Sequence, residues 1–378
     1  MISCVDPYHL ETNTFEDAIV VEATITNELK KQEIKLSRTY RFEEDGPTFE
    51  TGAEVYITDD QGANYEFEEL NGKYVSVLEF QASPNRQYQL NILTSDGKSY
   101  ISTNEKLTTE SPIENINPTV VTKNGETGVK LGVSSYDPSS TSKYYRYEYE
   151  ETYKIIAPKY SPLELLYNAE DDLLYTALRQ NETKTCYTTV KSNSIILANT
   201  NDLSEDRVDN FEVRFISNLN YIISHRYSIL VRQYVQNLPS YTFYKTLKDL
   251  SGSGSILSQN QPGFFYGNLK SANDPNEKVI GFFDVSSVSQ KRIFFNYADL
   301  FPGQPLPPYF NSCENISFDM SDPGPPSGPS PREILIILLN QGGLRFYSHE
   351  GTVYNMVVQE CGDCTTFSSN IIPEFWID

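Results

Sequence analysis

The first hundred residues alternate between apolar and polar positions in short runs, as half-buried strands do. Turn sequences such as Asn71-Gly72 and Asp96-Gly97 separate these runs. The pattern predicts seven strands, at residues 18–27, 31–40, 53–58, 63–67, 72–76, 87–93 and 98–102. Seven short strands within about 90 residues are typical of an immunoglobulin-like or fibronectin-like sandwich.

The remainder of the chain also favours strands, with longer and less regular runs. Strands are predicted at 129–136, 144–156, 194–199, 226–234, 264–269, 279–285, 291–297 and 352–359. One short helix is expected from Pro162 to Tyr167, because proline suits the first helical position. A second is expected at 241–250, capped by Ser240. The apolar run 332–339 fits either a strand or a buried helix.

These patterns predict a mainly β protein in three parts. Residues 1–14 form a tether, residues 15–112 form the immunoglobulin-like or fibronectin-like sandwich, and Ser111-Pro112 marks its end. Residues 113–378 form a larger β-rich domain with one or two short helices.

The charge narrows the choice of partner. Lysine and arginine total 30 against 51 aspartate and glutamate residues, for a net charge of −21. Residues 1–115 hold 22 acidic and 9 basic side chains, so −13 of the net charge lies in the tether and the sandwich that follows it. Nucleic acid and anionic lipid head groups are thereby excluded as the main partner, because binding them requires clustered positive charge.

The first of the five cysteines follows Met1-Ile2-Ser3, which matches the end of a bacterial lipobox. We therefore expect Cys4 to be the lipid-bearing first residue of the mature chain, held to a membrane by its acyl chains. The alternative is an ordinary cytosolic N-terminus with a chance cysteine. No run of about 18 apolar residues offers a membrane-spanning helix.

The other four cysteines form the even set that disulfides in an exported protein require: Cys186, Cys313, Cys361 and Cys364. Cys361 and Cys364 are expected to join the tail to Cys313 and Cys186 rather than to each other, because a Cys-x-x-Cys ring is small and strained. A metal or redox site is the alternative. It is disfavoured because the pair follows a strand-like segment and the three histidines (His9, His225 and His349) are scattered.

No catalytic motif stands out, neither GxSxG, HExxH, a Walker sequence nor a dinucleotide-binding glycine pattern. Carboxylate pairs such as Glu43-Glu44 and Asp171-Asp172 are interpreted as solvated surface, and Asp59-Asp60 as a hairpin turn rather than a calcium loop. No catalytic, metal-binding or cofactor-binding residue is assigned, and no cofactor is expected.

Aromatic side chains suggest a sugar-stacking surface as an alternative function. The candidates are Tyr144, Tyr145, Tyr147, Tyr149 and Trp376. Cross-strand packing of the tyrosines, and anchoring of the tail by Trp376, are the preferred interpretations.

Several segments carry a family resemblance. They include Ile19-Val-Val-Glu-Ala-Thr-Ile-Thr-Asn27, Gly52-Ala-Glu-Val-Tyr-Ile-Thr-Asp-Asp60, Asp96-Gly-Lys-Ser-Tyr100, Val279-Ile-Gly-Phe-Phe283, and Cys361-Gly-Asp-Cys364 with Pro373-Glu-Phe-Trp376. With these and Cys4, the chain resembles the Bacteroidota lipoproteins of domain-of-unknown-function family 4249 nearly from end to end. It departs in the tail, where Thr365-Thr-Phe-Ser-Ser-Asn370 replaces a Gly-Gly-Thr-Asn-type stretch.

The resemblance implies an outer-membrane lipoprotein, often encoded beside TonB-dependent receptors, and implies no known reaction. We therefore expect a non-enzymatic accessory lipoprotein that docks on a TonB-dependent transporter or another outer-membrane β-barrel and assists substrate capture or assembly. The cell surface is the expected side of the membrane, rather than the periplasmic face. The alternatives are a surface adhesin or carbohydrate-binding module and, after these, a hydrolase.

Overall fold

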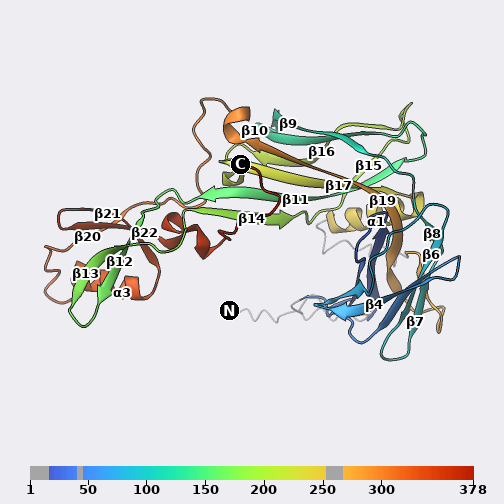
Figure 1. Ribbon diagram of the computed structural model, residues 1–378, viewed down its shortest axis with the longest axis horizontal. Coiled ribbons are helices and arrows are strands. Elements are labelled where there is room, and N and C mark those ends of the chain that lie inside the picture. The colour runs from blue at the N-terminus through green and yellow to red at the C-terminus, as the bar shows by residue number, and fades with distance from the viewer. Residues whose placement is uncertain (1–16, 41–45, 253–266) are drawn as a thin grey trace, which may run out of the picture.

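A computed structural model describes residues 17–40, 46–252 and 267–378. The chain is mainly β, as predicted, and forms three connected bodies (Figure 1). The seven strands predicted in the first hundred residues are all present, followed by a two-residue strand: β1 (Ile19–Thr26), β2 (Glu33–Arg38), β3 (Glu54–Asp59), β4 (Asn64–Leu70), β5 (Lys73–Ser76), β6 (Gln87–Leu93), β7 (Ser99–Ser102) and β8 (Glu105–Lys106).

Two strands from late in the sequence complete this first body, which we call the N-terminal module. They are β18 (Leu269–Ser271), antiparallel to β7, and β19 (Val279–Asn296), whose first half is parallel to β1. The sheet runs β19-β1-β2-β5-β4-β3-β6-β7-β18 and wraps one core that includes Ile25, Ile57 and Phe283. The module predicted for residues 15–112 therefore also contains residues 267–286. Residues 264–266 of the predicted strand 264–269 lie outside the described residues.

Two packed sheets form the second body, which we call the central body. One sheet contains the second half of β19 together with β11 (Tyr144–Ile156), β14 (Thr185–Lys191), β15 (Ile196–Asn199) and β17 (Arg226–Gln236). The other contains β9 (Ile113–Lys123), β10 (Glu126–Tyr136) and β16 (Arg207–Ser217). Alternate residues of both sheets, such as Leu131 and Ile229, point inward and form the core between them.

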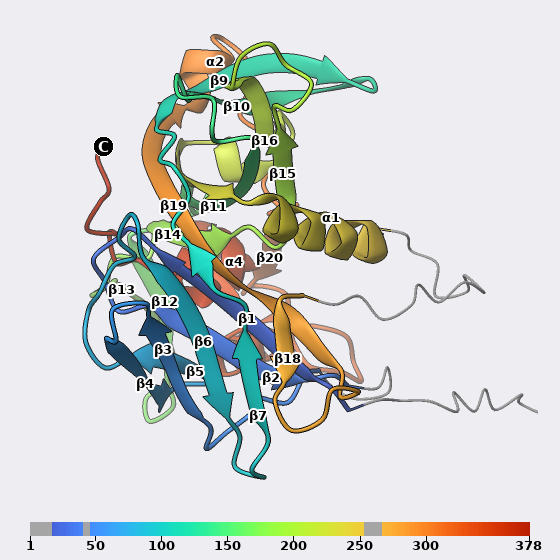
Figure 2. The same cartoon turned by 90° about the vertical axis from the view of Figure 1, so that its right-hand side faces the viewer.

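Strand β19 is the link between the two bodies (Figure 2). Residues 279–286 pair with β1 of the N-terminal module, and residues 287–296 pair with β17 of the central body. The two strands predicted at 279–285 and 291–297 are thus one. At Gly281 φ is +139°, and an added Cβ would lie 2.1 Å from the carbonyl oxygen of Val21. Only glycine allows β1 and β19 to approach this closely here.

The third body, the C-terminal lobe, projects from the far end of the central body (Figure 1, left). It contains the hairpin β12 (Leu163–Asn168) and β13 (Leu173–Leu178), the sheet β20 (Ile316–Asp319), β22 (Val353–Val358) and β21 (Leu344–Glu350), and helix α3 (Pro331–Asn340). These elements share a small core around Leu165, Leu335 and Met356. The strand predicted at 352–359 is confirmed as β22.

The helix predicted from Pro162 to Tyr167 is wrong, because this segment is β12. Leu163 and Leu165 lie two positions apart and pair across the hairpin with Leu178 and Thr176, and Leu165 is buried in the lobe core. Pairing with β13 and the burial of Leu165 outweigh the local preference of a proline for a helix start. The run 332–339 lies within α3, where Ser330 and Glu333 cap the helix start reciprocally.

The predicted helix 241–250 lies within α1 (Leu238–Gly252), which stands between the N-terminal module and the central body (Figure 2). Ser240 does not cap the helix. Asn237, the residue before the helix, does so, because its Oδ1 accepts from the backbone N–H of Ser240 at 2.8 Å.

The short elements are α2 (Tyr297–Leu300), α4 (Gln359–Gly362), and the 3-10 turns η1 (Tyr221–Ile223) and η2 (Cys364–Thr366). Among the described residues, no helix combines the length and apolar character needed to cross a membrane.

Candidate binding cleft

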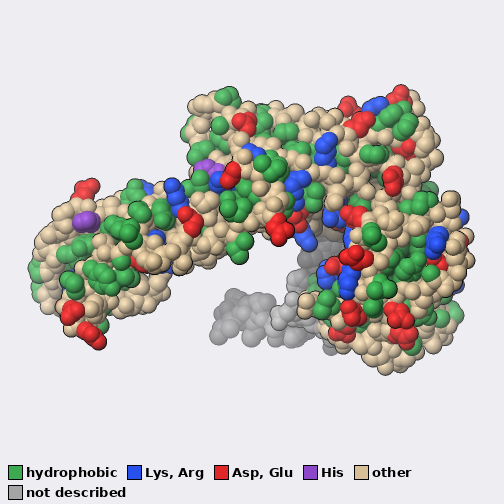
Figure 3. Space-filling model, in the orientation of Figure 1, with side chains coloured by type: hydrophobic (Ala, Val, Ile, Leu, Met, Phe, Trp, Pro, Cys, Tyr) green, Lys and Arg blue, Asp and Glu red, His purple; other side chains and the backbone are tan. Residues whose placement is uncertain are grey.

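A cleft of about 590 Å³ lies where the N-terminal module meets the central body. Its walls come from the β1–β2 turn, from β11 and β17, from residues 191–195 and from α1. A neighbouring hollow of about 570 Å³ shares several of these walls and extends along β1 to Phe282. Basic and acidic side chains gather at this junction (Figure 3). We call the two together the inter-module cleft.

Arg146 forms part of the cleft wall. On β11 it lies directly opposite Tyr234 of β17, and its guanidinium stacks between the rings of Tyr234 and Tyr244, at 4.3 and 4.7 Å from their centroids. Only 9% of the side chain is exposed, and Nη1 donates to Glu148. Burial acts to lower the pKa of Arg146, but Tyr244 and Glu148 outweigh it, and the pKa is raised. Arg146 is therefore a permanently charged group held between two aromatic rings.

Behind Arg146 lies the buried carboxyl group of Asp284 on β19. Its Oδ2 accepts from Ser286 Oγ at 2.7 Å and from Gln236 Nε2 at 3.4 Å, and Gln236 Nε2 also donates to Ser240 Oγ at 2.9 Å. Burial raises the pKa of Asp284, and the positive charge of Arg146 opposes that rise. This network ties the first turn of α1 to β17 and β19.

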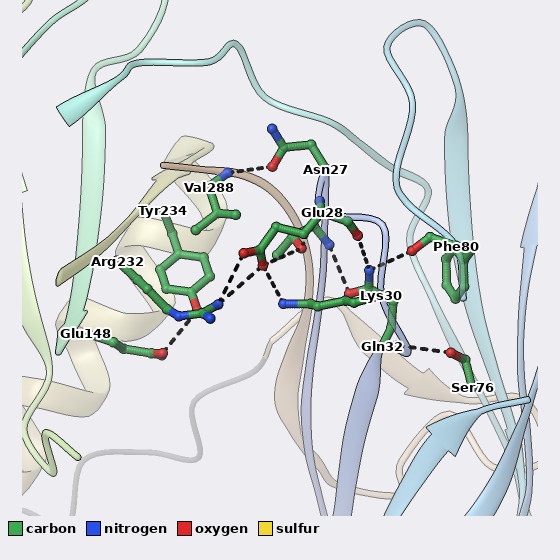
Figure 4. A network of polar contacts seen from close by, with 11 residues as sticks. Asn27, Glu28, Lys30, Gln32, Ser76, Phe80, Glu148, Arg232, Tyr234 and Val288 are labelled. Carbon is green, nitrogen blue, oxygen red and sulfur yellow. Dashed lines mark hydrogen bonds and ion pairs between the residues drawn. The ribbon is translucent and has the colours of Figure 1, made fainter. Parts of the chain in front are cut away.

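Glu28, in the β1–β2 turn, joins the N-terminal module to the central body (Figure 4). Its carboxylate accepts from Lys30 of the same turn and from Arg232 Nη1 of β17, the latter at 3.3 and 3.4 Å. Burial acts to raise the pKa of Glu28, but the hydrogen bond from Lys30 and the charge of Arg232 leave it lowered. Asn27 adds a further bond, its Oδ1 accepting from the Val288 amide at 2.8 Å.

The amide side chain of Gln32 holds the same turn from inside the module. Its Nε2 donates to the carbonyls of Glu28 at 3.0 Å and Phe80 at 2.9 Å, while Oε1 accepts from the Thr26 amide at 3.3 Å (Figure 4). The backbone N–H of Gln32 donates to Ser76 Oγ at 2.9 Å. The cleft wall formed by this turn is therefore built from satisfied polar groups rather than from a loose loop.

The cleft is locally positive in an acidic chain. The first hollow is lined by five basic residues (Lys30, Lys31, Arg146, Lys191 and Arg232) and three acidic ones (Glu33, Glu148 and Glu150). Each of the three carboxylates has a cationic partner: Lys73 for Glu33, Arg146 for Glu148 and Arg292 for Glu150. Four of the five basic residues are paired in turn, Lys30 and Arg232 with Glu28, Lys31 with Glu68 and Arg146 with Glu148. Lys191 forms no ion pair within the described part of the chain. Lys191 therefore supplies the unpaired positive charge of the first hollow, and it favours an anionic ligand there, beside Tyr149.

The tyrosines of β11 do not form the stacking surface considered from the sequence. Tyr145 and Tyr147 are fully buried between the two sheets, where Tyr147 packs on Phe211 at 5.4 Å. Their strand neighbours on β17 are Val235 and Gln233, so the packing is between sheets rather than a cross-strand aromatic ladder. Tyr149 lines the cleft, and Tyr144 lies against Tyr241 of α1.

The disulfides follow the predicted arrangement. Cys186 joins Cys364, and Cys313 joins Cys361. Both bonds lie where the tail and the C-terminal lobe meet the central body. Cys4 lies outside the described residues, so its expected lipidation remains a prediction.

Trp376 packs between Tyr187 of β14 and Phe294 of β19, with centroid distances of 5.0 and 5.8 Å. It thus anchors the tail to the central body, in agreement with the preferred interpretation.

The acidic side chains that the structure describes form no metal-binding cluster. Among the described residues, no group of three or more His, Cys, Asp or Glu side chains is arranged to hold a metal ion. Asp59 organises a hairpin turn, its Oδ1 accepting from the amides of Gln61 and Ala63 at 3.0 and 2.9 Å. Asp172 pairs with Arg332 at the tip of the β12–β13 hairpin. Glu43 and Glu44 lie outside the described residues.

Apart from the tyrosines of β11, the cleft residues were not identified from the sequence. Arg146 and Glu148 share one face of β11, opposite to that of Tyr145 and Tyr147, which is a period-two signal visible in the sequence. Arg232 and Tyr234 repeat it on β17, where the register makes them the direct neighbours of Glu148 and Arg146. No sequence pattern indicates the part that Glu28 plays in the cleft wall, because Glu28 and its partner Arg232 lie 204 residues apart in the chain.

Comparisons with solved structures give weak likenesses. A pullulanase of Anoxybacillus sp. LM18-11, crystallised with maltotriose, is 12% identical, with a TM-score of 0.15 over 57% of this chain and 24% of that one. The BSP domain of a biofilm-associated protein is 9% identical, with a TM-score of 0.11 over 73% and 58%. Neither likeness bears on the fold or function of this chain. A search of curated proteins finds no match.

A family model matches far more of the chain. The model of a domain of unknown function, DUF4249, matches residues 5–292, which is 288 of 378 residues. The match covers the whole N-terminal module and both walls of the inter-module cleft. The chain therefore belongs to the DUF4249 family, whose description names no activity.

Proposed function

We propose that this protein is a Bacteroidota lipoprotein, anchored in the outer membrane through Cys4, that acts as a non-enzymatic accessory subunit of a TonB-dependent transporter or another β-barrel complex. In this role it captures an anionic ligand in the inter-module cleft and presents it to the barrel. The observation that carries the proposal is the cleft itself, in which Lys191 adds an unpaired positive charge to a lining of paired basic and acidic groups, in a chain with net charge −21.

The side chains of the cleft support binding rather than chemistry. Arg146 and Glu148 are engaged with each other and with Tyr234, and Glu28 is engaged with Lys30 and Arg232. Side chains held in such ion pairs and hydrogen bonds can give a bound ligand a charged and shaped surface, but they are not free to act as acids, bases or nucleophiles. His225 and His349, the two histidines among the described residues, do not line the cleft.

The position of the module near the anchor also supports the proposal. Residues 5–18 separate Cys4 from β1 and span at most about 50 Å when fully extended. The N-terminal module would therefore stay close to the membrane. Its acidic surface would be repelled by anionic head groups, which leaves the cleft accessible to a protein partner.

The anchor is tested by metabolic labelling of the full chain with a radioactive fatty acid. Label is expected on the wild-type protein and not on Cys4→Ala, while Cys186→Ala serves as the control that keeps its label. Label that persists in Cys4→Ala would contradict the anchor.

The accessory role is tested by purifying the lipidated protein from native membranes in mild detergent after chemical cross-linking. A β-barrel protein is expected to co-purify. A double variant, Arg146→Met with Lys191→Glu, should keep the barrel but lose the anionic ligand carried with it. Recovery of the protein without any barrel, from membranes in which it is abundant, would contradict the proposal.

A further inference from the structure

A second pocket lies at the neck between the central body and the C-terminal lobe. Its volume is about 650 Å³, and its walls come from β12, residues 179–183, the end of α3, β21 and η2. The disulfide Cys186–Cys364 and a hydrogen bond from the Cys364 amide to the Thr183 carbonyl, at 3.0 Å, hold the two sides together. The pocket is thus a built feature, remote in the fold from the inter-module cleft.

Arg179 is the unusual residue of this pocket. Only 7% of its side chain is exposed. Nη1 donates to Thr183 Oγ1 at 3.1 Å and lies 3.6 Å from Asp363 Oδ2. Nε and Nη2, both buried, have no hydrogen-bond partner in the described part of the chain. These two N–H groups lie on one edge of the guanidinium, which is the fork that binds a carboxylate through two parallel hydrogen bonds.

The charge of the pocket leaves Arg179 short of a full counter-ion. Asp363 serves two guanidinium groups, since its Oδ2 also accepts from Arg345 Nε at 3.2 Å. Its Oδ1 is engaged by the Thr365 amide at 3.0 Å. One carboxylate therefore faces two cations, and buried donors of a charged group are costly to leave unpaired. Glu164, the other acidic residue lining the pocket, forms no ion pair among the described residues.

Apolar side chains form the wall beside this fork. Leu166 and Leu339 line the pocket while partly exposed, and Leu165, Leu344 and Phe346 lie buried behind them. A ligand that fits both features has one carboxylate and an apolar body. Because Nε and Nη2 are shielded from solvent in this conformation, binding includes a small shift of the Arg179 side chain or of the pocket wall.

We propose that the neck pocket binds a carboxylate with an apolar body, its two oxygens on Nε and Nη2 of Arg179 and its apolar part against Leu166 and Leu339. A free short-chain carboxylic acid and the C-terminus of an apolar peptide share this chemistry. The site is independent of the proposed function, because it uses no residue of the inter-module cleft.

The test is isothermal titration of the full-length, disulfide-intact protein with three probes. Hexanoate represents the free acid, N-acetylleucine represents a peptide C-terminus, and hexanamide has the apolar body without the charge. At least one acid is expected to bind saturably and at least about ten-fold more tightly than hexanamide. Tighter binding of hexanoate would identify the ligand as a free acid, and tighter binding of N-acetylleucine would identify it as a peptide C-terminus. Equal binding of the acids and the amide, or no binding of either acid, would overturn the proposal.

Variants locate the site. Arg179→Met is expected to weaken binding of the acid at least about ten-fold, with circular dichroism and both disulfides unchanged. Arg332→Met removes a partly exposed arginine of the same lobe, which pairs with Asp172 outside the pocket, and should bind like the wild type. If Arg179→Met does not fold, Arg179→Lys is measured in its place. It keeps the positive charge but loses the two parallel N–H donors, so it should also weaken binding of the acid. Wild-type affinity in a folded Arg179 variant would show that the acid binds elsewhere.

Discussion

Arg146 and Tyr234 are direct neighbours on adjacent strands, and the guanidinium of the first lies 4.3 Å from the ring centroid of the second. The ring of Tyr244 on α1 lies against the same guanidinium, with its centroid at 4.7 Å. One charged side chain thereby joins β11, β17 and the helix between the two modules. The cleft wall depends on this stack for its position as well as for its charge.

Replacing Arg146 with alanine should destabilise the fold by about 2–3 kcal/mol. The change removes two cation–π contacts and the packing of the arginine stem, and it leaves Asp284 without its cationic neighbour. Urea denaturation followed by fluorescence measures the loss. Arg207→Ala is the control, since Arg207 stacks on Tyr136 at 4.0 Å but its side chain is 43% exposed. Its loss should stay below about 1 kcal/mol, and equal losses would show that burial of Arg146 contributes nothing.

Gly281→Ala should disrupt the junction of β1 and β19. Its φ of +139° strains any other residue, and the new Cβ would lie 2.1 Å from the Val21 carbonyl oxygen. We expect a loss of more than about 3 kcal/mol, or failure to fold. Gly343→Ala is the matched control, because a Cβ there meets no atom within 4 Å. That variant should change the unfolding free energy by less than about 1 kcal/mol.

Asp137 should make stability depend on pH. Burial acts to raise the pKa of its carboxyl, but hydrogen bonds from Ser139, Thr141 and Ser142 outweigh it and hold the pKa well below its usual range. A depressed folded-state pKa stabilises above the unfolded value of about 3.9, and this contribution is lost as pH falls below it.

Asp137→Ala should therefore cost about 2 kcal/mol or more at pH 7 and progressively less below about pH 4. Denaturation curves at several pH values measure the difference. The control is Asp202→Ala, at an exposed position, which should be nearly neutral throughout. A loss for Asp137→Ala that grows on acidification would contradict the assignment.

The two disulfides should contribute unequally. Cys186–Cys364 closes a separation of 178 residues and Cys313–Cys361 one of 48. In the loop-entropy account the first stabilises by about 1 kcal/mol more. Paired serine variants at each bond, compared by chemical denaturation with the other bond intact, test this order. A larger loss for the shorter loop would mean that native-state packing, rather than loop closure, decides the contribution.

Local pattern was sufficient for the N-terminal strands and for α1, because alternation and helical spacing are properties of neighbouring residues. The strand β12 was misassigned for the opposite reason, since Leu165 is drawn into a core whose other members lie at residues 318–356. The inter-module cleft depends still more on distant pairing. Glu28 and Arg232 meet only because β19 brings the two bodies together, and nothing near either residue indicates that contact.

The shared strand also determines how the molecule would carry load. Eight consecutive residue pairs join β1 to β19 in parallel, from Ile19 with Val279 to Thr26 with Ser286. A pull on the N-terminal end of β1, resisted where β19 continues into the central body, acts along these strands in opposite directions. All the bonds of the ladder are then sheared together instead of being peeled apart singly. Under the proposed tether, drag on the chain would therefore load all eight residue pairs at once.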